Sequence, residues 1–231
     1  MRKLLLFIIL SICCHRALSQ STHGTTGLLN IPTAAMQEDG TFSAGGNFLP
    51  ASFTPSTFSY HTGNYYFNIC FLPFLEVTYK MTLIKSRYTD GGYTEQDRSF
   101  GVRLRLLKEQ QYLPALVLGG NDIYTSGGSV NQYFGSMYAV ATKTLAWKEN
   151  RLGVSIGYGP DLFGKGQLQG VFGGLSYSPS FLKHLELMVD YDTHVFNAGA
   201  SVLLFNHLYL HAFLSDFNTL VAGAALKFKL Y

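Results

Sequence analysis

The sequence predicts an all-β protein: a transmembrane antiparallel β-barrel of about twelve strands with an N-terminal signal peptide. Apolar residues alternate with polar or small residues through most of the chain, which indicates strands with two different faces. Most of these stretches are near the roughly 9–11 residues of a tilted membrane strand. Charged residues make up 13% of the chain, about half of the roughly 25% in an average soluble domain.

A targeting signal is predicted at the N-terminus. A basic pair at 2–3 is followed by nine apolar residues at 4–12, which are too few to cross a bilayer as a helix. Small residues at 17 and 19 are typical of a signal-peptidase site. We therefore expect residues 1–19 to be removed on export. No later run approaches the roughly 18 apolar residues that a membrane-spanning helix needs.

Removal of this segment changes the cysteine count and the net charge. Of the three cysteines Cys70 would remain, so no intrachain disulfide is expected. A lipoprotein signal is disfavoured, because Ile12 instead of a small residue precedes Cys13. Three of the 17 basic residues would also be lost, which leaves 14 against 14 acidic residues. A neutral chain lacks the basic surface that nucleic acid requires, so no nucleic-acid partner is expected.

Twelve candidate strands follow from the alternation. In 152–158, for example, Leu, Val, Ile and Tyr alternate with Gly and Ser. An even number of strands allows a closed antiparallel barrel with both chain ends in the periplasm. The candidate strands cover 41–48, 64–71, 74–86, 98–108, 113–123, 132–143, 151–159, 169–177, 184–192, 195–205, 207–215 and 219–231.

The connections alternate in length along most of the chain. Long or Gly-, Ser- and Pro-rich segments at 49–63, 87–97, 124–131 and 160–168 are separated by mostly shorter ones at 72–73, 109–112, 144–150 and 178–183. This alternation is typical of long extracellular loops and short periplasmic turns, although the last three connections are all tight. We assign residues 41–231 to the barrel. Residues 20–40 are either a periplasmic tail or a plug that enters it.

Period two alone fits a soluble β-sandwich as well as a membrane barrel. In a sandwich the apolar face is the core, whereas in a membrane barrel it meets lipid and the polar face lines the lumen. The signal peptide, the sparse charge, and the Tyr and Phe residues at strand ends favour the barrel. The aromatic C-terminus does so too, although Tyr231 falls in phase with the polar positions of the last strand.

Charged residues on the polar phase of the strands are the best candidates for a site. Two interpretations stay open: the charges neutralise one another as salt bridges in the lumen, or they line a path for a polar polymer. Twelve strands give a narrow lumen in either case. The candidate lumen-lining residues are Glu76, Lys80, Arg103, Arg105, Glu186, Asp190, Asp192, Lys227 and Lys229.

Catalytic motifs occur as strings but lack the structural context that they need. The stretch 153–157 matches G-x-S-x-G, yet Ser155 lies in the middle of an alternating strand and not at a strand-to-helix turn. The stretch 159–166 is close to a phosphate loop but has Gly166 in place of the Ser or Thr that binds magnesium. We therefore predict no catalytic residue, no metal site and no cofactor, and expect that the protein is not an enzyme.

A motif near the N-terminus carries a family resemblance. The run TGLLNIPTAAM at 26–36 is followed by EDG at 38–40, and further pieces follow in order up to VDYD at 189–192. The motif residues are Gly27, Leu28, Asn30, Pro32, Thr33, Met36, Asp39 and Gly40. This ordered set resembles the YjbH family of outer-membrane proteins linked to exopolysaccharide and capsule production. Familiar members are much longer, so the chain resembles one barrel unit of them.

The resemblance implies a barrel that assists secretion or assembly of an extracellular polysaccharide, as a non-catalytic passage or scaffold. It also implies periplasmic polysaccharide-export proteins and a polysaccharide as partners. The barrel itself implies outer-membrane lipid and the barrel-assembly machinery of a Gram-negative bacterium as further partners. Three alternatives remain: a passive small-solute porin, a structural or adhesive barrel with a plugged lumen, and, less favoured, a barrel enzyme acting on lipids. Residues 26–40 have either a purely structural role or a role as a plug or partner-docking segment.

Overall fold

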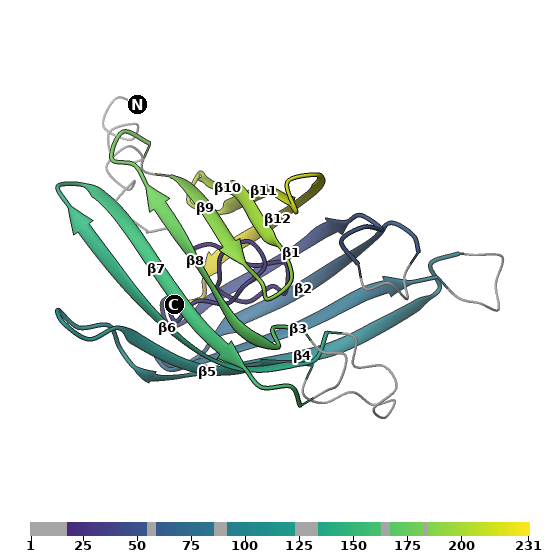
Figure 1. Ribbon diagram of the computed structural model, residues 1–231, viewed down its shortest axis with the longest axis horizontal. Helices are drawn as coiled ribbons and strands as arrows, with labels where there is room; N and C mark the ends of the chain where they lie inside the picture. Colours follow the sequence, from purple (N-terminus) through teal and green to yellow (C-terminus); the bar gives the residue numbers. More distant parts are fainter. Residues whose placement is uncertain (1–17, 55–58, 86–91, 123–133, 163–166, 183) are drawn as a thin grey trace.

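The protein folds as a closed barrel of twelve antiparallel strands (Figure 1). The computed structural model describes residues 18–54, 59–85, 92–122, 134–162, 167–182 and 184–231. The predicted all-β barrel is confirmed, while nearly all of the predicted signal peptide lies outside the described residues. The strands are β1 (Thr41–Leu49), β2 (Thr62–Cys70), β3 (Leu75–Ile84), β4 (Glu95–Leu107), β5 (Ala115–Asn121), β6 (Ser136–Trp147), β7 (Asn150–Gly159), β8 (Gly170–Ser178), β9 (Leu185–Tyr191), β10 (Phe196–Leu204), β11 (Leu208–Ser215) and β12 (Thr219–Lys229).

Each strand pairs with its neighbours in sequence, and the pairing of β1 with β12 closes the barrel. In that pair Thr41 lies opposite Lys229. The predicted ends differ most for β6, which was expected at 132–143. The strand is displaced because its outward residues continue through Leu145 and Trp147, up to a two-residue turn before β7. Among the described residues, no helix is long and apolar enough to cross a membrane.

The two ends of the barrel differ in their connections. Because Thr41 and Lys229 are register partners, the start of β1 and the finish of β12 lie at the same end, which we call the turn end. The connections there are 71–74, 108–114, 148–149, 179–184 and 205–207. The opposite end, the loop end, carries 50–61, 85–94, 122–135, 160–169, 192–195 and 216–218. The longest connections therefore gather at the loop end, and the last two are short, as the sequence indicates.

The outward face of the barrel is apolar. In β7 the side chains of Val154, Ile156 and Tyr158 are 38%, 61% and 57% exposed, whereas Ser155 is buried. The same alternation in β12 exposes Phe228. Period two in this chain thus places the apolar residues outside and the polar residues inside, which is the reverse of a soluble sandwich.

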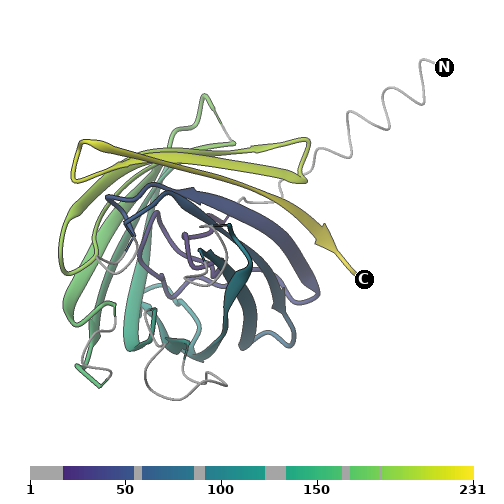
Figure 2. The ribbon, with the colours of Figure 1, turned by 90° about the vertical axis from the view of Figure 1, so that its right-hand side faces the viewer.

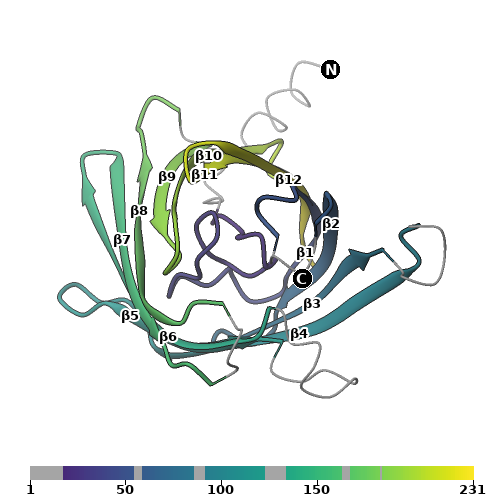
Figure 3. The same cartoon turned by 45° about the vertical axis from the view of Figure 1, so that its right-hand side comes forward.

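Residues 18–40, which we call the lumen segment, lie inside the ring of strands (Figures 2 and 3). Residues 19–34 are buried throughout. The segment forms tight turns: the Leu28 amide donates to the Ile31 carbonyl at 2.9 Å, and Pro32 forms a bridge with Gly27. A Cβ atom at Gly27 would lie 2.3 Å from the Ile31 carbonyl oxygen, so this turn requires glycine.

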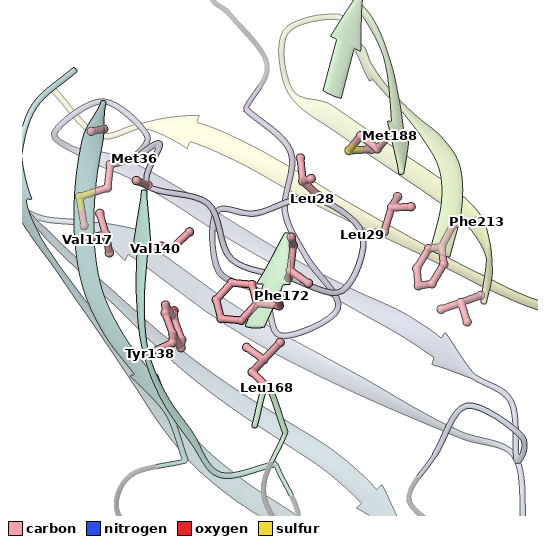
Figure 4. Packing of buried hydrophobic residues seen from close by; sticks show 14 of the residues in the cluster. Leu28, Leu29, Met36, Val117, Tyr138, Val140, Leu168, Phe172, Met188 and Phe213 are labelled. Atoms are coloured by element: carbon pink, nitrogen blue, oxygen red, sulfur yellow. The ribbon is translucent and has the colours of Figure 1, made fainter. Parts of the chain in front are cut away.

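The lumen also contains an apolar cluster, in contrast to the expected polar interior. Figure 4 shows Met36 of the lumen segment beside Val117 of β5, and Leu29 beside Phe213 of β11. Met188, which breaks the alternation of β9, is 2% exposed and belongs to the same cluster. These wall residues turn inward because the lumen segment supplies apolar surface to bury them. Its contributions are Leu28, Leu29, Ile31, Ala34 and Met36.

The apolar cluster predicts a stability effect that can be measured. Leu29 is fully buried. The substitution Leu29→Ala is expected to lower the free energy of unfolding of the protein by about 2–5 kcal/mol, because the change leaves a cavity. The control Leu162→Ala, at a 60% exposed loop position, is expected to change it by at most about 0.5 kcal/mol. Urea unfolding followed by Trp147 fluorescence measures both, and equal effects would contradict the packing described.

Candidate functional site

Two neighbouring strands place an ion pair inside the barrel. Glu76 of β3 and Arg103 of β4 are cross-strand register partners. Their side chains are 0% exposed, and Nη1 of Arg103 lies 2.7 Å from Oε2 of Glu76. Both residues are on the polar phase of their strands, so the alternation that exposes apolar residues turns them inward. A buried pair of this kind needs further hydrogen bonds to offset the loss of water.

The lumen segment supplies most of those hydrogen bonds, beside one that Asn68 of β2 donates to Glu76 at 2.9 Å. Thr26 donates its amide to Glu76 at 2.7 Å and its hydroxyl at 2.9 Å. Arg103 donates to the carbonyl oxygen of Thr33, and to that of Ala35 at 3.1 Å. The ion pair therefore fixes the segment at both ends of its central turn.

A second anchor lies on β9 and just beyond it. Oδ2 of Asp190 accepts the amides of Leu29 and Asn30, each at 2.9 Å, while Oδ1 accepts the Asn197 side chain at 2.8 Å. Asp192 accepts the Asn30 side chain at 2.7 Å. These acidic residues therefore bind the lumen segment and not the basic residues of β12.

The start of the lumen segment is held by two further predicted residues. Lys227 of β12 donates to the Leu18 carbonyl oxygen. Glu186 of β9 accepts the hydroxyl of Ser19. Lys227 also lies over the Tyr209 ring, 4.5 Å from its centroid. A basic residue of β12 and an acidic residue of β9 thus both bind the start of the segment.

Two of the predicted lumen residues lie at the rim of the turn end. Arg105 donates to the carbonyl oxygen of Pro73 in the β2–β3 turn. Lys229 pairs with Glu38 at 2.9 Å, and both side chains are largely exposed. Near a strand end the inward phase meets solvent, so phase alone does not place a residue inside the lumen.

The motif residues Asp39 and Gly40 form the exit of the lumen segment into β1. Gly40 has a φ of +76°, a conformation that favours glycine. The Tyr231 hydroxyl donates to Asp39 at 2.7 Å, and a Cβ atom at Gly40 would lie 2.8 Å from the Tyr231 ring. The last residue of the chain therefore contacts this exit, which accounts for its position off the apolar phase.

Lys80 and His23 lie near the loop end of the lumen, where both line a small cavity. The Lys80 ammonium lies 4.2 Å from the centroid of the Phe134 ring. Neither ring nitrogen of His23 has a hydrogen-bond partner in the described part of the chain. Burial, and secondarily the charge of Lys80, hold the pKa of His23 well below its ordinary value of 6.5. His23 is therefore neutral at pH 7.

Uncharged polar side chains also hold the lumen segment, and they are absent from the residues predicted to line the lumen. Asn47 and Asn64 donate to the Thr22 carbonyl oxygen at 3.1 and 3.0 Å. The Thr142 hydroxyl accepts the Ala34 amide at 2.7 Å. All three wall residues lie on the inward phase of β1, β2 and β6. The inward phase of the alternation is the sequence signal that marks these residues, although the predicted lumen-lining residues are all charged.

The Ser155 motif is built into the wall. Ser155 is buried in β7 and shares a hydrogen bond of 2.9 Å with the Thr142 hydroxyl, so it faces another hydroxyl and not a base. Among the described residues, no group of three or more His, Cys, Asp or Glu residues could hold a metal ion. The inward polar and charged side chains of the wall bind the backbone of the lumen segment. Glu76 and Arg103 neutralise each other as a salt bridge, in agreement with the first interpretation of the inward charges. These two residues, with Asp190 and Asp192, also bind the lumen segment, which neither interpretation included.

Comparison with known proteins identifies a family for the part of the chain that includes the lumen segment. The sequence model of the family described as "Exopolysaccharide biosynthesis protein YbjH" matches residues 19–170, which span most of the lumen segment and β1 to β7. The chain belongs to the YjbH family. This YjbH-family chain is also 31% identical over 146 residues to the "Uncharacterized lipoprotein YjbH" of Escherichia coli strain K12. That match covers 61% of the chain and 19% of the E. coli protein, so the chain corresponds to a minor part of that relative.

Arg103→Met tests the ion pair. It is expected to lower the free energy of unfolding by about 3–5 kcal/mol, because Glu76 would stay buried without its counter-ion. The matched control Lys229→Met removes the exposed pair with Glu38 and is expected to cost at most about 1 kcal/mol. Both values come from urea unfolding. An Arg103→Met loss no larger than that of the control would contradict the anchoring role.

Acidification is expected to destabilise the fold through His23. Below pH 6.5 the unfolded chain takes up a proton at His23, whereas the buried ring stays neutral. Stability is then lost by about 1.4 kcal/mol per pH unit until the pKa of the folded state is reached. Burial raises the pKa of Asp122 to about 7, which acts in the opposite direction.

The contribution of His23 is isolated by comparing wild type with His23→Gln, since Asp122 is common to both. Unfolding midpoints are measured at steps from about pH 7.5 to about pH 5, the range in which the ordinary imidazole titrates. Wild type should lose more stability than the variant over this range. The same pH dependence in both proteins would refute the role of His23.

Proposed function

We propose that this chain is an outer-membrane β-barrel that assists the secretion or assembly of an extracellular polysaccharide without catalysing a reaction. The observation that carries the proposal is the apolar outward face of a closed barrel, in a chain of the exopolysaccharide biosynthesis family. In a bilayer every backbone polar group must be paired within the protein, and a closed strand ladder meets that requirement. The apolar side chains outside meet the lipid.

The orientation follows from the connections. Outer-membrane barrels have short turns in the periplasm and long loops outside the cell. The turn end, with both termini of the barrel, would then face the periplasm, and the loop end the exterior. Periplasmic polysaccharide-export proteins would meet the turn end. Outer-membrane lipid and the barrel-assembly machinery remain the expected partners of the wall.

The occupied lumen supports a scaffold or a gated passage over a passive small-solute porin. A porin needs a water-filled channel, whereas here residues 19–34 are buried within the ring. The anchors on Glu76 and Asp190 are hydrogen bonds, which hydrated ligands can replace. A gated passage would open by displacement of the lumen segment, and a scaffold would keep it in place.

The E. coli relative is named a lipoprotein. For this chain we propose export through a cleaved signal peptide at 1–19 and residence in the outer membrane of a Gram-negative bacterium. The contacts of Leu18 with Lys227 and of Ser19 with Glu186 would then belong to the uncleaved chain, and the anchors from Gln20 onward would remain. The non-catalytic role is supported by Ser155, whose hydroxyl is engaged with Thr142 in the wall. A lipid-acting barrel enzyme has no comparable observation in its favour.

The function is tested in the host. A strain without the gene is expected to release less extracellular polysaccharide, and the intact chain is expected to restore release. Unchanged polysaccharide in the deletion strain would refute the proposal. The Arg103→Met variant is then compared at equal amounts of barrel in the outer membrane. If it restores release, the ion pair contributes to stability alone; if it does not, the ion pair is required for secretion.

Passage and scaffold are distinguished by locking the lumen segment. Ala34 and Thr142, which are joined by a 2.7 Å hydrogen bond, are replaced by cysteines in a Cys70→Ser background. A gated passage should conduct in planar bilayers after reduction of the new disulfide and stay closed when oxidised. A scaffold should show no conductance in either state and should restore secretion in both. Conductance in the oxidised state would refute the role of the segment as a gate.

A further inference from the structure

A pocket of about 470 Å³ opens at the loop end of the barrel, above the lumen segment. Its volume lies within the range of roughly 300–1,000 Å³ found for small-molecule sites. Four connections contribute to it: those after β1, β7, β9 and β11. Asn30 of the lumen segment also lines it. The pocket is distinct from the hydrogen bonds that hold the segment in place, apart from the bonds that Asn30 donates to Asp190 and Asp192.

The polar groups of this pocket keep hydrogen-bonding capacity. Oε1 of Gln167 is buried and has no partner in the described part of the chain. The Asp216 side chain is exposed in the turn between β11 and β12. His194 uses Nδ1 for the Thr193 hydroxyl at 2.8 Å, which leaves Nε2. An acceptor amide, a carboxylate and an imidazole therefore converge on one space.

Apolar surface lies beside these groups. Phe53 lines the pocket and packs edge-to-face on Phe213, with ring centroids 5.8 Å apart. Leu168 and Val195 complete this side. A sugar ring has hydroxyl groups at its edge and C–H groups on its faces, so it matches a site with hydrogen-bonding groups beside an aromatic and aliphatic wall.

The charge of the pocket restricts the ligand further. Its lining includes the carboxylates of Asp192 and Asp216 but no Lys or Arg among the described residues. The nearby Lys80 lines the smaller cavity below and interacts electrostatically with Asp97 and Asp122. An acidic sugar would meet repulsion here, whereas a neutral or amino sugar would not.

We propose that this pocket binds a short stretch of a saccharide chain made of neutral or amino sugars. The inference rests on the proposed function, and it adds the class of polymer and the residues that recognise it. Gln167 accepts a hydrogen bond from a sugar hydroxyl, Asp216 accepts one from a hydroxyl or an ammonium group, and Phe53 packs against the ring. The pocket is placed where a polymer leaving the cell would first meet the exterior.

Binding is measured on the full chain in detergent micelles by isothermal titration calorimetry. The probes are three oligosaccharides of equal length: neutral N-acetylglucosamine, cationic glucosamine and anionic galacturonic acid tetramers. The neutral and cationic tetramers should bind, and the anionic one should bind at least about tenfold more weakly, because Asp192 and Asp216 repel its carboxylates. The variant Gln167→Leu should weaken the neutral tetramer about tenfold, since a buried acceptor is lost.

The substitution Asp216→Asn tests whether the negative charge of the pocket contributes to binding of an amino sugar. It should weaken the glucosamine tetramer about tenfold and change the neutral tetramer much less, because a charge-assisted bond is lost. Asp39→Asn at the turn end is the matched control, and should bind all probes as wild type does. Three results would each overturn the pocket assignment. They are that the galacturonic acid tetramer binds most tightly, that Gln167→Leu and Asp216→Asn bind the probes as wild type does, or that the folded wild type binds no probe.

Failure of the pocket and failure of the proposed function can be told apart in the deletion strain. If both wild type and Gln167→Leu/Asp216→Asn restore polysaccharide release fully, the proposed function stands and the pocket assignment fails. If the deletion leaves release unchanged while calorimetry gives the expected pattern, the pocket stands as a saccharide site and the role in secretion fails.

Discussion

The Glu76–Arg103 ion pair imposes a constraint on the groups that pack around it in the lumen. Both side chains are fully buried, so their remaining donors and acceptors need partners in place of water. The lumen segment provides an amide, a hydroxyl and two carbonyl oxygens for this purpose. Charge in the wall and polar backbone in the segment therefore depend on each other, and neither is well solvated inside the barrel alone.

Apolar packing acts together with this polar anchoring. A barrel of twelve strands is wider than the eight-stranded barrels whose interior side chains fill the lumen by themselves. Here the segment occupies the centre, and the wall adjusts to it: inward Gly157 leaves room for the Phe172 ring, which a Cβ atom would approach to 2.2 Å. Phe172 in turn packs in the cluster with Leu28 (Figure 4). Small inward residues therefore accommodate packed side chains and do not mark an open channel.

The barrel could be predicted from the sequence, but the position of the lumen segment inside it could not. Strand phase is a local property, so it predicted the twelve strands and the inward position of Glu76, Arg103 and Asp190. The position of residues 18–40 depends on contacts far away in sequence, such as Leu29 with Asp190, and a turn-rich segment is compatible with a tail or a plug. Met188 was recognised as an exception in phase, but its reason, the apolar surface of the segment, is a tertiary one.

The kinds of contact in the lumen also limit how the segment could leave it. Displacement would leave the Glu76–Arg103 ion pair in the wall but would remove the hydrogen bonds that the segment makes to Glu76, Arg103 and Asp190. Buried charged groups that lose hydrogen bonds are destabilised unless another polar group replaces them. Water or a polymer rich in hydroxyl groups can replace the amide donors that these carboxylates now bind. An apolar ligand cannot replace them, although it could cover the Leu29 and Phe172 surfaces. The polar anchors thus favour exchange with a hydrated polymer, and the apolar cluster opposes opening in the absence of one.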